Sequence, residues 1–329
     1  MSVLITRNGL MDTIQDAGRY GHQHIGVNPG GVMDMIAMQV ANFLVGNKPT
    51  EALIELHFPA AEIRFEEPAL IALSGGDLTA TLNGEPVSIL QPVFVTKGAT
   101  LRFTRLVTGT RGYLSVQGGL QADNWLNSNS TNLKVSAGGF QGRALKKGDR
   151  IFFKQQGPYF FKTGSNGFLA FPWKANVADL YFTQPFHFIA GAEYEQLEPA
   201  SKKIMEQGSF VIDSQSDRMG YRLRGDAVSL QVKKEVISTA VTKGTIQLLP
   251  DGQLIILMAD HQTTGGYPRI GHIISADISS LAQLAAGKKL SLTKTDIESA
   301  EQRSLLQQRN LRQLQNACIF RLQEYVNRV

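Results

Sequence analysis

The sequence predicts a mainly β protein with two domains and a helical C-terminal tail. Up to residue 293, short apolar stretches such as 69–76 and 253–260 alternate with glycine and asparagine turns, which is typical of strands in sandwiches and barrels. A glycine turn followed by alternating apolar residues occurs at 95–103, 145–153 and 284–292, as expected for a turn that leads into a strand. The length of 329 residues is more than one small core needs, so two domains are expected.

The expected domain boundaries follow from changes in this pattern. We predict an N-terminal β domain over 1–165, a C-terminal β domain over 166–293 and a helical tail over 294–329. The segment 154–178 is rich in glycine, proline and aromatic residues and has no clear period. It is therefore the expected crossing between the two domains.

Two stretches show signals of an α-helix. Residues 33–45 follow the turn Pro29-Gly30-Gly31 and end at Gly46, so this helix has both a start and a stop signal. A second helix is predicted to begin at Thr295 with the capping box Thr295-x-x-Glu298 and to reach the C-terminus. Its apolar stripe fits either packing on its own barrel or docking of a second chain, and consists of Leu311, Leu314, Cys318, Leu322 and Tyr325.

Composition and charge argue against several classes of protein. Hydrophobic residues make up 43% and charged residues 19%, as in an ordinary soluble protein, and no apolar run is long enough for a membrane span. Cys318 is the only cysteine and no secretory signal is found, so an intramolecular disulfide cannot form and a cytoplasmic location is expected. The basic residues behind the net charge of +5 are scattered, which favours a solvated surface over a nucleic-acid interface.

The familiar catalytic motifs are absent from the sequence. There is no GxxxxGK[ST] phosphate loop, no HExxH and no GxSxG, and a single cysteine rules out CxxC. His22 and His24 would share one face of a strand and could bind a metal. Because no third ligand is in view, we interpret them as ordinary polar residues and expect no metal site.

Four polar clusters remain, each beside a glycine turn. Residues 13–34 place charged groups around a Pro-Gly-Gly turn at a helix start, where free backbone N–H groups suit a carboxylate or a phosphate. Paired glycines end the predicted strands in 73–78 and 116–120, which lets a ligand approach the backbone closely. The fourth cluster joins 216–225 to 260–271, and this last stretch carries more hydrogen-bonding groups than a turn needs.

Taken together, these motifs resemble the allophanate hydrolase subunit 2 family, also described as the C subunit of 5-oxoprolinase and as the biotin-dependent carboxyltransferase domain of urea carboxylase. The matching stretches occur in the family's order and are Thr13–Arg19, Pro29–Asp34, Ser74–Asp77, Val116–Gly119, Ser216–Leu223 and Asp260–Pro268. Asn129 and Asn132 depart from the family pattern, because they replace its usual arginine and aspartate. If that charge pair orders a substrate loop, substrate choice changes here; if it is a surface bridge, little is lost.

The resemblance implies two cyclophilin-like β-barrels with a cleft between them, lined in part by 260–271. It also implies three candidate functions. The first is a subunit of an ATP-dependent 5-oxoprolinase, which converts 5-oxoproline, ATP and water to glutamate, ADP and phosphate. The second is biotin-dependent carboxyl transfer to urea or a similar amide. The third is a non-catalytic regulator that binds a kinase-inhibitor partner. We expect the first, because the chain carries no biotin-attachment segment and no fused carboxylase.

This first function implies particular cofactors and partners. ATP, with Mg²⁺, would be bound by a pattern other than a phosphate loop or shared with partner subunits, and no biotin would be attached to this chain. The expected partners are a subunit 1-type companion protein and a third subunit. The C-terminal helix would also allow a homo-oligomer, and no nucleic-acid or membrane partner is expected.

The expected site residues come from the matching motifs. Arg19 is expected to hold the substrate carboxylate, with Arg218 or Arg222, and Asp16 and His261 to move protons. The expected catalytic residues are Asp16, His261 and Tyr267. The expected substrate-binding residues are Arg19, His24, Gly30, Asp34, Asp77, Gln117, Gly118, Gly119, Arg218, Tyr221, Arg222, Gln262, Thr263, Thr264, Gly265 and Gly266.

Overall fold

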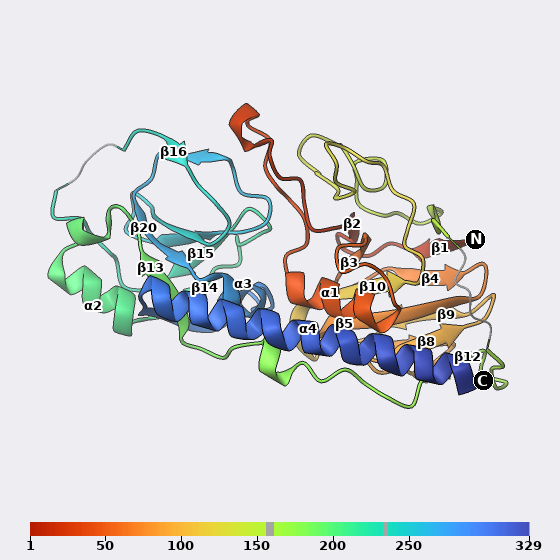
Figure 1. Ribbon diagram of the computed structural model, residues 1–329. Helices are drawn as coiled ribbons and strands as arrows, with labels where there is room; N and C mark the ends of the chain where they lie inside the picture. The colour runs from red at the N-terminus through yellow and green to blue at the C-terminus, as the bar shows by residue number, and fades with distance from the viewer. Residues whose placement is uncertain (156–160, 233–235, 329) are drawn as a thin grey trace. The chain divides into compact units, whose positions relative to one another are not determined.

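A computed structural model describes residues 1–155, 161–232 and 236–328 of the chain (Figure 1). The described residues form two compact units, and the first consists of 1–19, 34–177 and 311–329. The second consists of 20–33 and 178–310. The predicted mainly β fold with a C-terminal helix is confirmed. Of the two predicted barrels, the second unit contains a closed barrel, and the first unit contains two six-stranded sheets.

The units are built from segments that are distant in the sequence, whereas the predicted domains are continuous. The divisions after residues 165 and 293 therefore stay a prediction about domains. Part of the predicted crossing at 154–178, namely 156–160, lies outside the described residues.

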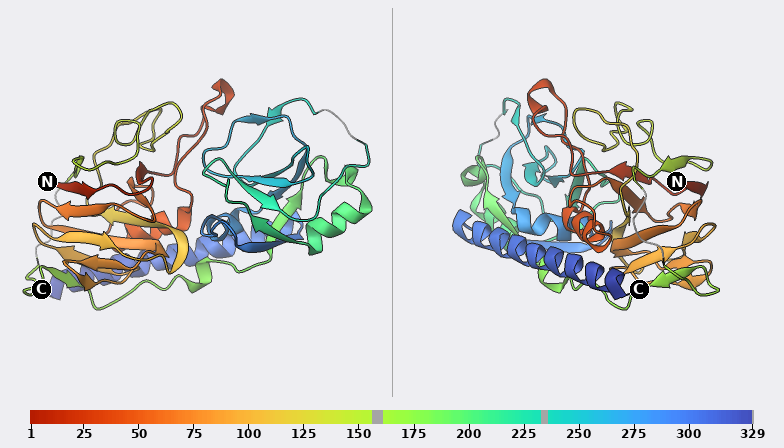
Figure 2. Two further views of the ribbon diagram at one scale, coloured as in Figure 1. Left: turned by 180° about the vertical axis from the view of Figure 1, so that it is seen from behind. Right: turned by 45° about the vertical axis from the view of Figure 1, so that its right-hand side comes forward.

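The first unit contains two six-stranded sheets (Figure 2). One sheet has the order β11 (Arg150–Phe152), β1 (Ser2–Arg7), β4 (Glu62–Phe65), β9 (Thr100–Phe103), β6 (Ala80–Leu82) and β7 (Glu85–Pro86). The other has the order β12 (Phe168–Ala170), β8 (Pro92–Val95), β5 (Ala69–Asp77), β10 (Thr108–Val116), β3 (Leu53–His57) and β2 (Thr13–Gln15). Side chains from both sheets share one apolar core, which includes Val3, Ile63, Ile71 and Leu101.

The second sheet has one face in the apolar core, and its other face carries both apolar and polar side chains. Ile14, Ile54 and Leu114 point into the apolar core from β2, β3 and β10. Because side chains alternate along a strand, the residues between them point to the opposite face. Helix α1 (Met35–Leu44) packs on this sheet against β5 and β10, so a buried polar layer lies within the unit.

The second unit is a closed barrel of seven strands. Their order is β13 (Phe186–Ala190), β20 (Arg269–Ile273), β17 (Thr245–Leu248), β18 (Leu254–Leu257), β15 (Gly220–Arg224), β14 (Ser209–Ile212) and β21 (Lys289–Lys294). The barrel closes through the parallel pairing of β13 with β21, while the other neighbours are antiparallel. The shorter elements of this unit are η1 (Gln23–Ile25), η2 (Ala178–Leu180), η3 (Tyr194–Gln196), α2 (Pro199–Gln207), α3 (Ser275–Ala282) and a ribbon of β16 (Thr239–Ala240) and β19 (Thr264–Gly265).

The predicted helix at 33–45 is confirmed as α1. The side chain of Asp34 accepts a hydrogen bond from the N–H of Ala37 at 3.0 Å, which is the contact of an N-cap residue. Asp34 is fully buried and therefore has a structural role that needs no ligand.

Helix α4 (Ile297–Arg328) begins later than predicted. The capping box from Thr295 to Glu298 is wrong, because Asp296 accepts a hydrogen bond from the N–H of Ser299 at 2.7 Å and so caps the helix. Thr295 still belongs to the barrel, since its N–H donates to the carbonyl of Phe188 at 2.9 Å.

The apolar stripe in the C-terminal half of α4 packs on the first unit. Cys318 and Leu322 are buried, and the Tyr325 ring lies 4.2 Å from the Phe171 ring between centroids. The stripe therefore packs within the same chain, but on the first unit and not on the barrel as predicted. Docking of a second chain stays a prediction. None of the described helices is both long enough and apolar enough to cross a membrane.

Candidate functional site

A buried carboxylate, that of Glu55, lies among the polar side chains of the first unit. Glu55, on β3, is fully buried and accepts a hydrogen bond from the hydroxyl of Tyr113 at 3.0 Å. The same hydroxyl accepts the N–H of Asp34 at 3.0 Å, at the start of α1. Burial raises the pKa of Tyr113 well above its usual value, and the charges of Glu55 and Asp34 add to this. Tyr113 therefore stays protonated and connects the helix start to the carboxylate.

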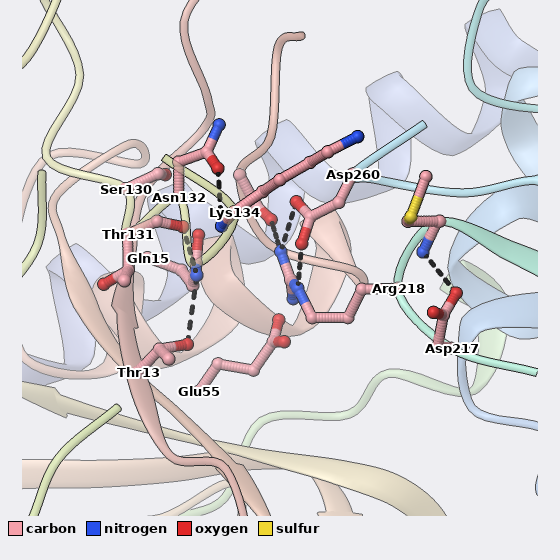
Figure 3. Close-up of polar contacts among 12 residues, drawn as sticks. Thr13, Gln15, Glu55, Ser130, Thr131, Asn132, Lys134, Asp217, Arg218 and Asp260 are labelled. Atoms are coloured by element: carbon pink, nitrogen blue, oxygen red, sulfur yellow. Dashed lines mark hydrogen bonds and ion pairs between the residues drawn. The ribbon is translucent and has the colours of Figure 1, made fainter. Parts of the chain in front are cut away.

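The side-chain amide of Gln15 is held within the polar layer of this unit. Its Nε2 donates to Oγ1 of Thr13 at 3.0 Å and to the carbonyl of Thr131 at 3.2 Å (Figure 3). Gln15 is 1% exposed. Thr131 lies 116 positions further along the sequence, so these contacts join the edge strand β2 to the loop of residues 128–132.

Asp16 organises this loop. Its Oδ1 accepts the N–H of Gly18 at 2.8 Å and the hydroxyls of Ser128 and Ser130 at 2.6 Å each. Its Oδ2 accepts the N–H of Asn129 at 2.6 Å. Four donors thus use the carboxylate, which favours a positioning role for Asp16; the predicted role in proton transfer stays a prediction.

Arg19 contacts the same loop. This arginine is 1% exposed, and its Nη2 donates to the carbonyl of Ser130. Its guanidinium carbon lies 4.7 Å from the centre of the Trp125 ring, which is within the range of a cation–π contact. The structure therefore brings the predicted residues Asp16 and Arg19 together on one loop.

The two departures from the family pattern have different positions in this loop. Asn129 contacts Asp16 through its backbone N–H, so that contact does not depend on the side chain at 129. The side-chain oxygen of Asn132 accepts the N–H groups of Lys134 and Val135, at 3.1 and 3.3 Å. An aspartate would accept the same bonds, so the replacement removes a charge and keeps the turn.

In the second unit, Arg218 joins three of the sequence motifs. Its Nε and Nη2 donate to the two carboxylate oxygens of Asp260, at 2.8 and 3.2 Å, and its Nη2 also donates to the carbonyl of Gly31 at 2.6 Å (Figure 3). Arg218 is 4% exposed. This paired geometry uses the fork of the guanidinium, so it favours a structural role over the predicted contact with a substrate carboxylate.

Lys243, which is outside the predicted site, binds the segment next to Gly31. Nζ of Lys243 donates to the carbonyls of Val32 and Met33, at 3.2 and 2.8 Å. With the Arg218 contact to Gly31, these bonds fix residues 31–33 on the barrel. The sequence gives little signal for Lys243, because a lysine before a glycine turn is ordinary on a surface.

His261 is buried near the charges of Lys243 and Asp260 and is neutral near pH 7. Burial lowers its pKa, and the charge of Lys243 lowers it further, against opposing effects of Gln262 and Asp260. Its Nδ1 lies 2.6 Å from the carbonyl of Gln262. Because a carbonyl only accepts, Nδ1 carries the hydrogen and Nε2 has the lone pair. Such an imidazole can take up a proton, as the sequence prediction requires.

The turn that follows His261 contacts the buried side chain of Gln247 at Gly265 and Tyr267. Gln247 is fully buried on β17, and its Nε2 lies 3.5 Å from the carbonyl of Tyr267. A Cβ at Gly265 would lie 2.5 Å from that same nitrogen, so a larger residue at this position would force the Gln247 side chain to move. Sequence reasoning missed Gln247; the signal was a polar residue in the middle of the apolar run 245–248.

Tyr267 borders a separate cavity of about 680 Å³ in the second unit. The tyrosine is 43% exposed. The walls of the cavity include Val228, Leu230, Leu248, Gly266 and Pro268. The neighbouring Gln262 and Thr264 are exposed and Thr263 is half-buried, so part of the predicted loop is open to solvent.

Several predicted substrate residues have structural contacts of their own. Asp77 accepts the N–H of Thr79 at 2.8 Å, which closes a turn. The Gln117 amide donates to the carbonyl of Val45 at 3.2 Å, and the N–H of Gly118 donates to Asn47 at 2.9 Å. Gly118 and Gly119 have φ of +81° and +79°, a backbone conformation that requires glycine here.

The remaining predicted residues belong to the second unit. The Tyr221 hydroxyl donates to the carbonyl of Ala282 at 3.1 Å in the barrel core, while the Arg222 side chain is exposed. Gly30 is buried with φ of +61°. His24 is exposed on the short helix η1, so the expectation that it shares a strand face with His22 is wrong. Among the described residues, no three His, Cys, Asp or Glu side chains are grouped to hold a metal ion.

The fold and these clusters are those of a two-unit β protein in which glycine-rich motifs organise buried polar groups. The chain belongs to the carboxyltransferase domain family, subdomains A and B, whose model matches residues 25–294. The predicted resemblance is thereby confirmed. The whole of α4 lies beyond the matched region.

Two bacterial relatives match along nearly their whole length. The C subunit of the 5-oxoprolinase of Escherichia coli K12 is 34% identical over 310 residues, which cover 94% of this chain and 96% of the relative. The protein of the same name from Haemophilus influenzae is 33% identical over 288 residues, covering 88% and 89%. These similarities support a subunit of a 5-oxoprolinase or urea carboxylase type of system.

The fold is also that of part of a larger solved protein. The crystal structure of the K. lactis urea amidolyase matches with a TM-score of 0.86 at 24% identity. The match covers 95% of this chain and 20% of the amidolyase chain. At this identity the likeness concerns the fold alone.

Proposed function

We propose that the chain is a subunit of an ATP-dependent 5-oxoprolinase and contributes part of the site for the cyclic amide. The observation that carries this proposal is the reciprocal match with the C subunit of the Escherichia coli 5-oxoprolinase, which covers 94% of this chain and 96% of the relative. The amidolyase match, in contrast, covers 20% of a much longer chain.

The chemistry requires a site that holds a small carboxylate and handles protons at an amide. Resonance makes the lactam slow to hydrolyse. Transfer of phosphate from ATP to the lactam oxygen releases ADP and makes the carbonyl carbon open to attack by water. The ring C–N bond then breaks as its nitrogen takes up a proton, and hydrolysis of the resulting acyl phosphate gives glutamate and phosphate. In this proposal Arg19 attracts the substrate carboxylate, and Asp16 holds the Ser128–Ser130 loop in position for it. The neutral His261 takes up a proton at Nε2.

ATP and its Mg²⁺ belong, in this proposal, to a surface shared with companion subunits. The sequence has no phosphate loop. The carboxylate of Asp16 is used by four donors and that of Asp260 by Arg218, so neither fits a Mg²⁺ ligand set. The residues of this chain therefore bind and orient the amide, and no step is assigned to the metal.

The test is 5-oxoproline-dependent release of ADP by this chain reconstituted with its two companion subunits. His261→Gln is expected to lower that rate by at least about 100-fold, because it removes the proton acceptor. His22→Gln is the matched control, since His22 is outside the set of expected site residues, and its rate is expected to equal that of the wild type. Assembly of each complex is checked by size-exclusion chromatography.

ADP release that stays at background in an assembled complex would overturn the lactam assignment. The carboxyltransferase name of the family then favours the second function, so urea with a separately supplied biotin carrier is tested next. If neither substrate is turned over while the complex forms, the regulatory function is favoured.

A further inference from the structure

We propose that the side-chain oxygen of Gln15 accepts a hydrogen bond from the N–H of the substrate amide, and so selects amides that carry a hydrogen on nitrogen. This inference rests on the proposed function. Gln15 is outside the set of site residues predicted from the sequence. It ends strand β2, and its side chain points to the polar layer because its neighbour Ile14 points into the apolar core.

The contacts of the Gln15 amide fix which atom is the oxygen. Nε2 lies 3.2 Å from the carbonyl oxygen of Thr131 and 3.0 Å from Oγ1 of Thr13. A carbonyl oxygen only accepts, so the nitrogen has to face it; a flipped amide would place two acceptors 3.2 Å apart. Both contacts are therefore made by Nε2, as the dashed lines in Figure 3 show, and Oε1 takes part in neither.

This oxygen is a buried acceptor without a donor among the described residues. Gln15 is 1% exposed, so bulk water does not replace the missing bond. Native proteins rarely leave such a group unpaired, and the exceptions are found where a ligand or an ordered water supplies the donor. Because Thr13 and Thr131 hold the amide plane, the acceptor is in place before any ligand binds.

The surroundings favour an N–H donor that is next to a carboxylate. Arg19 donates to the carbonyl of Ser130, and Gln15 donates to that of Thr131, so a cation and a fixed acceptor are anchored on consecutive residues. In 5-oxoproline the ring N–H is attached to the carbon that bears the carboxylate. In this inference, one small molecule meets Arg19 with its carboxylate and Gln15 with its N–H.

The experiment compares 5-oxoproline with the analogue in which a ring oxygen replaces the N–H. The analogue has nearly the same size, but its oxygen would face Oε1 of Gln15 as a second acceptor. In the reconstituted complex, the wild type is expected to bind the analogue at least about 100-fold more weakly, measured as inhibition of 5-oxoproline-dependent ADP release.

Gln15→Met keeps the length of the side chain and removes the acceptor. It is expected to lower kcat/KM for 5-oxoproline by at least about 10-fold and to strengthen inhibition by the analogue by a similar factor. A purely structural role cannot move the two ligands in opposite directions. Gln121→Met, at an exposed position, is the matched control and is expected to change neither value.

Each outcome separates this inference from the proposed function. A wild type that binds the two ligands equally well overturns the role of Gln15 without any variant, as does a Gln15→Met protein that weakens both ligands alike; Oε1 would then bind an ordered water. A wild type that releases no ADP with 5-oxoproline overturns the proposed function itself.

Discussion

At the scale of single residues, folding strongly changes the pKa of the Asp12 carboxyl group. It is fully buried, and its two carboxylate oxygens accept the N–H groups of His57 and Ala61, at 2.7 and 2.6 Å. Burial raises its pKa from 3.8 to about 7, with a further increase from Glu55 and an opposing effect of the two hydrogen bonds. The folded protein therefore keeps Asp12 protonated under conditions in which the unfolded chain has lost that proton.

We predict that Asp12 makes the protein less stable as the pH rises. Because its pKa is higher in the folded state, its contribution is complete below about pH 4 and is lost as the pH rises through about 7. A difference of about three pKa units corresponds to about 4 kcal/mol of unfolding free energy. Asp12→Asn removes this titration, so the stability of the wild type relative to the variant should fall by about 4 kcal/mol between pH 4 and pH 8.

Urea unfolding of both proteins across this range is the measurement. His261 and His272 have lowered pKa values, so they make the protein more stable with rising pH, but they are present in both proteins and cancel in the difference. Two curves that stay parallel would contradict the prediction.

The residue scale also shows what the sequence could and could not predict about the site. The motifs identified Asp16, Arg218 and His261 as special, because their density of polar groups exceeds what turns need. They could not predict that the partner of Arg218 lies 42 positions away and that of Asp16 up to 114 positions away. Such distant contacts decide whether a charged side chain is already paired within the protein or can bind a substrate. Sequence spacing carries no information about them.

At the scale of elements, the C-terminal half of α4 depends on a few buried side chains. Leu322 is 4% exposed, and Cys318 is 1% exposed with its pKa raised to about 12 by burial. Both the burial and the shortage of thiolate should make Cys318 react slowly with thiol reagents. Its labelling rate therefore reports how often this part of the helix leaves the unit.

We predict that Leu322→Ala speeds labelling of Cys318 by at least about 30-fold. A buried leucine reduced to alanine costs about 2–5 kcal/mol, and undocking of the helix becomes easier by a comparable amount. Phe320→Ala is the matched control, because Phe320 lies on the same helix but is 63% exposed. Equal rates for the two variants would show that Cys318 becomes exposed by another motion.

The helices show why elements can be predicted more closely than their ends. The stop and start signals around 33–45 agree with α1, since the glycines on both sides allow one interpretation. At the second helix, Thr295 and Asp296 are both good cap residues with polar residues three positions later, and the pattern does not choose between them. Pairing of Thr295 with Phe188 in the barrel decides the matter, and that contact is not local.

At the scale of the whole molecule, the mainly β character could be predicted from turn spacing, and the barrel came from the family resemblance. The grouping of the segments could not be predicted. Residues 20–33 belong with the barrel and 311–329 with the first unit, although both are remote from those units in sequence. Hydrophobic periodicity shows that a helix has a face to bury, and it does not show which surface that face will meet.

This grouping predicts that no single cut yields an intact first unit. A fragment of residues 1–177 lacks the side chains of Cys318, Leu322 and Tyr325, which pack on it in the full chain. Burying three such side chains contributes about 5 kcal/mol in total, so the fragment should unfold at a clearly lower urea concentration than the same unit in the full chain. A peptide of residues 311–329 should restore the lost stability in proportion to its concentration, and the same peptide with Leu322→Ala should not. If the fragment alone is as stable as the unit in the full chain, the C-terminal helix covers the first unit without stabilising it.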